Sequence, residues 1–158
     1  MITFTADNTR FKFRIVGIAL HDDRVLLHRL ETDDYWSLPG GTGELLEPAA
    51  DTLRREMLEE MGESVNVDWL VYVVENFFDH EGMRHHELAF YFLMTFAPDS
   101  PAYQLDAFPG VEDGKPLIFQ WHPLATLDEV PLYPTFLRRG LQALPAHTTH
   151  LAHTDIKP

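Results

Sequence analysis

The stretch GTGELLEPAADTLRREMLEEMGE, which runs from Gly41 to Glu63, decides the fold. Its second part predicts a helix over residues Pro48 to Met61, because proline suits the first helical position and Gly62 suits the residue that ends a helix. Apolar residues recur at helical spacing along one side of this helix and predict a face that packs on a sheet. They are Ala50, Leu53, Met57 and Met61.

The other side of the predicted helix carries Glu56, Glu59 and Glu60, so three carboxylates share one face. Arg55 precedes Glu59 by four residues and is expected to reach it. Like charges at this spacing cost about 0.2 to 0.5 kcal/mol per pair, which favours a cation that offsets them. Mg²⁺ and Mn²⁺ prefer such oxygen ligands. Taken alone, the cluster fits a solvated acidic face more readily than a metal site.

The whole stretch resembles the Nudix box, the signature of the Nudix hydrolase family that includes MutT-like proteins. The box asks for Gly, five residues, Glu, seven residues, Arg-Glu, an apolar residue, any residue, Glu-Glu, any residue, Gly and an apolar residue. Glu63 stands where the family prefers an aliphatic residue, a departure that lies outside the metal ligands. The matching residues are Gly41, Glu47, Arg55, Glu56, Met57, Glu59, Glu60 and Gly62.

This resemblance implies a metal-dependent active site on an α/β fold, the Nudix-type α/β/α sandwich with a mixed β-sheet. It assigns Glu56, Glu59 and Glu60 as ligands of Mg²⁺, with Mn²⁺ as a substitute, and makes Glu59 and Glu60 part of the catalytic group. It also implies that Arg55 orients a catalytic glutamate, while Glu47 and Gly41 shape the loop that carries it. The implied reaction is attack of a metal-activated water molecule on a phosphorus atom of the diphosphate.

Family members differ in the residue that acts as base, and some use a glutamate outside the box. Our candidate is Glu87 in the segment MRHHEL, where strand alternation sends Glu87 and His85 to one face. His85 and His86 are weaker candidates for the same role. A polar cluster at a strand end is more often solvated than catalytic, which is the competing interpretation.

Four residues before the helix are candidates for substrate contact. Gly40 and Gly41 let the backbone approach a phosphate closely, although an ordinary Pro-Gly turn explains them equally well. Tyr35 and Trp36 offer rigid rings on which a base can stack. Most of the aromatic residues that could supply such a stacking surface are expected to lie simply in the core.

The remaining chain predicts alternating strands and one more helix, with helices covering both faces of a mixed sheet. Residues 87–96 are apolar on both faces and are therefore expected at the centre of the sheet. Residues 97–116 are rich in Pro and Gly and are expected to be irregular, as in a lid. The other predicted strands are 11–20, 25–28, 65–78 and 117–121, and the second helix is 135–144.

One domain is expected over residues 1–158, with the tail 145–158 frayed. A hydrophobic content of 45% fits a folded core, and the net charge of -13 argues against a duplex nucleic-acid partner. No segment has the pattern of a signal peptide or a membrane span, so a cytoplasmic location is expected. The chain has no cysteine, which excludes thiolate nucleophiles.

The sequence thus predicts an Mg²⁺-dependent hydrolase that splits a diphosphate bond in a nucleoside diphosphate linked to another group. The alternative is a catalytically silent Nudix-fold module that senses a nucleotide. Isomerisation of isoprenyl diphosphates, which also occurs on this fold, usually needs a reactive cysteine.

Residues 76–81 (NFFDHE) lack the proline typical of ADP-ribose hydrolases and the tyrosine typical of dinucleoside polyphosphate hydrolases. Nucleoside triphosphates, including damaged ones, and nucleotide sugars therefore stay open as small-molecule substrates. Paired strands with exposed edges are compatible with a monomer or a homodimer.

Overall fold

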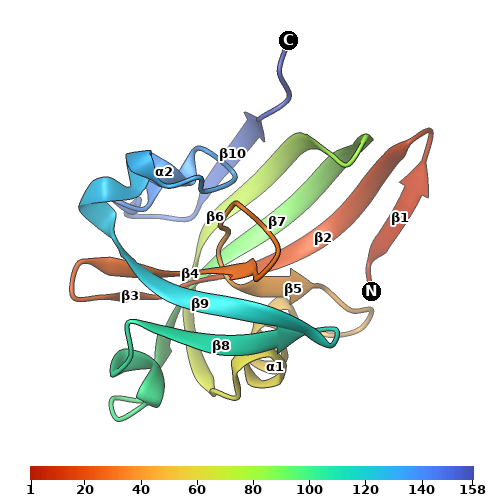
Figure 1. The fold of residues 1–158 in the computed structure, drawn as a ribbon. Helices are drawn as coiled ribbons and strands as arrows, with labels where there is room; N and C mark the ends of the chain where they lie inside the picture. The colour runs from red at the N-terminus through yellow and green to blue at the C-terminus, as the bar shows by residue number, and fades with distance from the viewer.

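The computed structural model describes all residues from 1 to 158 and contains a large mixed sheet at its centre (Figure 1). The strand order is β1-β2-β7-β6-β10, with β5 beside β2. β7 runs parallel to β2 and antiparallel to β6, which confirms its predicted central position. The strands are β1 (Thr3–Ala6), β2 (Thr9–Ile18), β5 (Gly40–Thr42), β6 (Val65–His80), β7 (Met83–Phe96) and β10 (Thr149–Thr154).

A second sheet of four antiparallel strands has the order β3-β4-β9-β8. Figure 1 shows β4, β9 and β8 crossing in front of the large sheet. Its strands are β3 (Leu20–His21), β4 (Arg24–Leu30), β8 (Ala107–Glu112) and β9 (Lys115–Pro123). The two strands expected to form a hairpin over residues 11–28 lie in different sheets. β2 pairs with β7 in the large sheet, whereas β4 pairs with β9 in the small one.

Helix α1 (Ala49–Met61) forms where the sequence predicts it, with Pro48 as its N-cap residue. Gly62 has a φ of 74° and its amide donates to the carbonyl of Leu58, so the helix ends in a left-handed cap. The helix packs against β2, β5, β6 and β8. Leu53 and Met57 are fully buried and join an apolar cluster between the two sheets.

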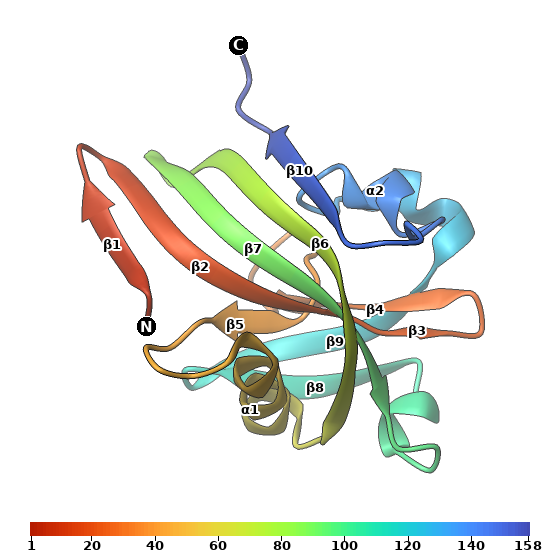
Figure 2. The ribbon, with the colours of Figure 1, turned by 180° about the vertical axis from the view of Figure 1, so that it is seen from behind.

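A second apolar cluster lies on the opposite face of the large sheet. Short helix α2 (Leu137–Gly140) and the 3₁₀ helix η2 (Leu124–Glu129) cover it. Tyr72 of β6 donates its hydroxyl hydrogen to the carbonyl of Gly140 at 2.9 Å, which fastens α2 to the sheet. Figure 2 shows α1 and α2 on opposite sides of β6. The predicted α/β/α sandwich is confirmed.

The structure corrects the predictions for residues 97–116 and for the second helix. Residues 97–116 are not a structureless lid, because they contain the 3₁₀ helix η1 (Pro101–Tyr103) and edge strand β8. An edge strand tolerates the Pro109 that argued against regular structure, since one side of its backbone needs no partner. Helix α2 is also much shorter than the predicted 135–144.

The tail is not frayed, because β10 pairs in parallel with β6 from Thr149↔Tyr72 to Thr154↔Phe77. Just beyond it, the Asp155 carboxylate accepts hydrogen bonds from the amide and hydroxyl of Thr135. These contacts join residues far apart in the sequence, so local composition gave no sign of them. No helix of the structure is long and apolar enough to cross a membrane.

Candidate active site

Strand β5, just before α1, carries two glycines in close contact with their neighbours, Gly41 with the box helix and Gly40 with β2. Gly41 pairs with Ile15 in the sheet, and a Cβ atom on Gly41 would lie 2.1 Å from Cδ of Glu56. A Cβ atom on Gly40 would lie 2.0 Å from the carbonyl oxygen of Ile15. Both residues are buried and are glycine because no side chain fits there. Their contact with a phosphate stays a prediction.

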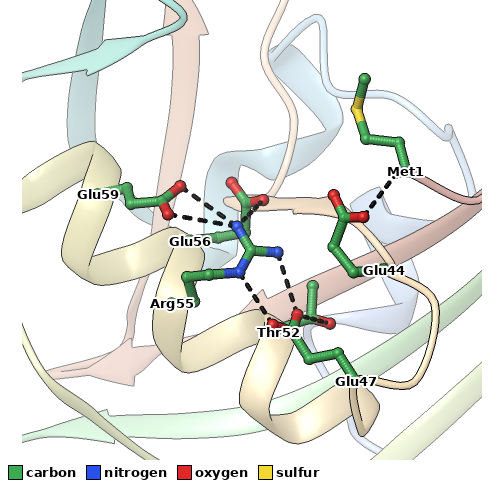
Figure 3. A network of polar contacts seen from close by, with 7 residues as sticks. All are labelled: Met1, Glu44, Glu47, Thr52, Arg55, Glu56 and Glu59. Atoms are coloured by element: carbon green, nitrogen blue, oxygen red, sulfur yellow. Dashed lines mark hydrogen bonds and ion pairs between the residues drawn. The ribbon is translucent and has the colours of Figure 1, made fainter.

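Arg55 is the centre of a network of carboxylates (Figure 3). Its Nε and Nη2 atoms donate to the two oxygens of Glu47, each at 3.1 Å, and this fork fastens the loop to the helix. Hydrogen bonds from Arg55 and Thr52 hold the pKa of Glu47 below its usual value. Nη1 of Arg55 donates to Glu56 at 3.0 Å and to Glu59 at 3.3 Å, so Arg55 reaches Glu59 as predicted.

Glu60 lies apart from this network and has no partner. Its side chain is 3% exposed, and neither carboxyl oxygen makes a hydrogen bond. Burial raises the pKa of Glu60 to about 9, although the charge of Arg14 opposes the shift. The Nδ1 atom of buried His28 is 3.8 Å away, and burial lowers the pKa of His28 to about 3. A buried carboxyl group without a partner is costly unless a cation or a donor offsets it.

The three box carboxylates, Glu56, Glu59 and Glu60, fit a divalent cation by their chemistry, since they supply hard oxygen donors. Burial raises the pKa of Glu56, while Glu59 is 59% exposed. In the observed conformation no three His, Asp or Glu side chains converge on one point. The guanidinium of Arg55 bridges Glu56 and Glu59 and supplies the compensating positive charge.

Glu112 is an acidic residue near the box that sequence reasoning missed. It ends β8, the strand that packs against α1. Its charge raises the pKa of Glu60, ahead of the contributions from Glu56 and Glu59. Close packing of the strand depends on Gly110, where a Cβ atom would lie 2.6 Å from the carbonyl oxygen of Glu60. No local motif marks Glu112, because only the pairing of β8 with β9 brings it here.

A cavity of about 790 Å³ opens beside β2, β6 and β7. Tyr35, His85 and Glu87 line it, whereas Trp36 does not. Trp36 instead packs edge-on against the His122 ring, with the two ring centroids 4.5 Å apart. His86 points to the other face and packs against Phe77. The lining includes Arg10, Lys12, Arg14, Tyr35, Asn76, Phe78, His80, His85, Glu87, Tyr91, Tyr133 and Asp155.

Glu87 therefore shares a face with His85, as strand alternation predicts. Its Oε1 atom accepts a hydrogen bond from Nδ2 of Asn76 at 3.2 Å. The cavity that Glu87 lines does not include any of the three box glutamates. Its role as a base stays a prediction.

Comparison with known proteins identifies the family to which the chain belongs. A model of the NUDIX domain matches residues 12–143. The chain belongs to the Nudix family. That match spans the box, most of the cavity-lining residues and Glu112, and the fold agrees with it. Family and fold together place the chain among Nudix-domain proteins.

Several solved structures share the fold at low sequence identity. A UDP-X diphosphatase is 18% identical with a TM-score of 0.61, over 89% of this chain and 66% of that one. A MutT Nudix hydrolase from Burkholderia pseudomallei is 24% identical with a TM-score of 0.57, over 73% and 84%. An ADP-ribose pyrophosphatase from Streptococcus suis is 17% identical with a TM-score of 0.51, over 90% and 98%. A sequence search of curated proteins gave no match.

Proposed function

We propose that this Nudix protein hydrolyses the diphosphate linkage of a nucleoside diphosphate joined to another group, such as a nucleoside triphosphate or a nucleotide sugar. Glu56, Glu59 and Glu60 would hold Mg²⁺, with Mn²⁺ as a substitute. The observation that carries the proposal is the buried carboxyl group of Glu60, whose two oxygens have no partner in the protein. A cation among acidic side chains stabilises such a group.

The protein's own residues contribute to the reaction in distinct ways. When bound, the metal ion neutralises phosphate charge and lowers the pKa of a water molecule. Arg55 holds Glu56 and the loop carboxylate Glu47 in place. Glu112 supplies an acidic group outside the box, where its oxygens are suited to accept the proton of the attacking water.

Positive charge for the phosphates comes from β2, since Arg10, Lys12 and Arg14 line the cavity. Lys12 lies close enough to Glu87 and Glu112 for both charges to act on its pKa, which burial lowers. Arg14 acts in turn on the pKa values of Glu56 and Glu60. The cations therefore connect the box to the cavity. This continuity supports a substrate whose diphosphate faces the box and whose remaining part enters the cavity.

The alternative, a nucleotide sensor without turnover, is disfavoured by the intact set of box glutamates. Support for a nucleoside diphosphate substrate also comes from the structural likeness to a UDP-X diphosphatase. The substrate is expected to be a small molecule, and either a monomer or a homodimer is compatible with the site. We expect the protein to work in the cytoplasm.

The test is release of phosphate and pyrophosphate from a panel of nucleoside triphosphates and nucleotide sugars in Mg²⁺. Glu60→Gln should lower turnover by more than about 100-fold, because it removes a charged ligand of the ion. Glu63→Gln is the matched control, since Glu63 lies just past the same helix and outside the ligand set. Tight nucleotide binding without turnover on any compound would favour the sensor.

A further inference from the structure

The cavity contains a pair of hydrogen-bond acceptors on neighbouring strands. Asn76 of β6 and Glu87 of β7 lie opposite each other in the sheet, and both line the cavity. Asn76 is 3% exposed, yet its Oδ1 atom has no hydrogen-bond partner. A buried amide oxygen without a partner costs free energy that a ligand donor recovers.

The orientation of the Asn76 amide follows from its neighbour. Nδ2 donates to Oε1 of Glu87 at 3.2 Å, and the reverse orientation would place two acceptors against each other. Oε2 of Glu87 makes no hydrogen bond, and no ion pair ties Glu87 to Lys12, its register partner on β2. The pair therefore leaves two acceptor atoms without a partner in the protein, Oδ1 of Asn76 and Oε2 of Glu87.

The same face of the sheet carries flat rings and cations next to this acceptor pair. Two residues along each strand, the rings of Phe78 and His85 stack with centroids 4.7 Å apart and planes 7° apart. Arg10 and Lys12 continue the two rows onto β2, where they lie beside His85 and Glu87. The rings of Phe78 and His85 are thus suited to a planar group, and the cations Arg10 and Lys12 are suited to phosphate.

We propose that Asn76 and Glu87 determine substrate specificity by accepting hydrogen bonds from two adjacent N–H or O–H donors on the substrate. This assignment rests on the proposed function, because it places the part of the substrate beyond the diphosphate in the cavity. It gives Glu87 a recognition role in place of a catalytic one. Adjacent donors occur at the N1–H and N2–H₂ edge of guanine and in the 2′,3′-diol of ribose.

Binding of nucleoside monophosphates without metal separates this inference from hydrolysis. We would titrate the protein with GMP, IMP and 2′-deoxy-GMP by calorimetry. IMP lacks only the N2 amino group, and 2′-deoxy-GMP lacks only one hydroxyl. A matched donor pair discriminates by about 5- to 150-fold, so GMP should bind that much more tightly than one of the two analogues. A preference over IMP assigns the donors to the base, and one over 2′-deoxy-GMP assigns them to the ribose.

Glu87→Gln should abolish this preference, since it turns one acceptor position partly into a donor. Asn76→Ala should weaken it, and thermal denaturation checks that this buried variant is folded. Glu75→Gln is the control, because Glu75 is next to Asn76 but points to the other face, where it pairs with His150. Equal affinity for all three nucleotides, or a preference that survives Glu87→Gln, would overturn the inference. If the parent protein hydrolyses a compound of the panel but Glu87→Gln keeps the preference for GMP, only this inference is overturned. If the parent protein prefers GMP but hydrolyses no compound of the panel, only the proposed function is overturned.

Discussion

At the scale of single residues, the site is defined by which acidic groups have partners and which have none. Arg55 satisfies Glu47, Glu56 and Glu59, so these carboxylates are stable without a ligand. Glu60 is buried without a hydrogen-bond partner, and Nδ1 of His28 lies 3.8 Å from its carboxyl group. The most costly group of the box is therefore the one best placed to gain from a cation.

Glu112 and Glu87 are expected to affect the reaction differently. Glu112→Gln should lower kcat by about 10²- to 10⁴-fold, because a base that accepts the water proton contributes that much. Glu87→Gln should act mainly on the choice between substrates. Measuring kcat and KM of both variants on one substrate checks this prediction, and a larger loss of kcat in Glu87→Gln would restore Glu87 as the base.

His28 is expected to act as a positioning residue for Glu60. His28→Leu should weaken Mn²⁺ binding about 10- to 100-fold, as is typical when a residue that supports a metal ligand is lost. It should not destabilise the fold strongly, since the variant also removes a buried nitrogen that has no partner.

Electron paramagnetic resonance of free Mn²⁺ measures the affinity, and urea denaturation measures the fold. His122→Leu is the control, because His122 is another buried histidine with an unpartnered nitrogen and packs on Trp36. Equal Mn²⁺ affinity in both variants would show that His28 does not support Glu60.

At the scale of elements, the C-terminal segment completes one edge of the large sheet and one wall of the cavity. Strand β10 adds a parallel edge to β6, and Asp155 just beyond it lines the cavity. Burial opposes ionisation of Asp155, but hydrogen bonds from Thr135 and His153 outweigh it and hold the pKa below 3.8. A carboxylate with a lowered pKa stabilises the fold above its unfolded pKa, and this contribution disappears as pH falls through the folded pKa.

Asp155→Asn is therefore expected to destabilise the protein by about 1 to 3 kcal/mol at pH 7, the contribution of hydrogen bonds to a charged group. The difference from the parent protein should shrink as the pH falls below 3.8, the ordinary pKa of the group. Urea denaturation at several pH values measures it. Glu75→Gln, which breaks the exposed pair with His150, should cost less than about 1 kcal/mol. A difference that does not depend on pH would contradict the prediction.

At the scale of the whole molecule, α1 lies between the two sheets, with Glu59 exposed on its accessible side and Glu60 buried. Its apolar side joins the cluster that includes Ile15 of β2 and Phe119 of β9. Ligand binding at this helix should therefore stabilise the whole fold. Mg²⁺ at 100 times its Kd should add about 2.7 kcal/mol to the free energy of unfolding.

Thermal denaturation with increasing Mg²⁺, at ionic strength held constant with KCl, measures this stabilisation. Glu60→Gln should lose most of the shift and Glu63→Gln should retain it. An equal shift in the two variants would mean that Mg²⁺ acts on the net charge of -13 and not at the box.

The sequence alone determined the box helix, its caps, the central strand and the link between Arg55 and Glu59. These features depend on spacing within one element, where neighbours in the sequence are neighbours in space. Family membership followed from the same local pattern.

Tertiary structure alone decided the places of Glu112, Asn76, β8 and β10. Each depends on pairing between strands far apart in the chain, and a strand's partner is set by the packing of the whole sheet rather than by its own residues. Pro109 and the tail beyond Pro145 look irregular by composition, but they become ordered because an edge strand gains hydrogen bonds and burial from its neighbour. Local spacing thus identifies which residues make up the box, while long-range pairing decides which groups surround it.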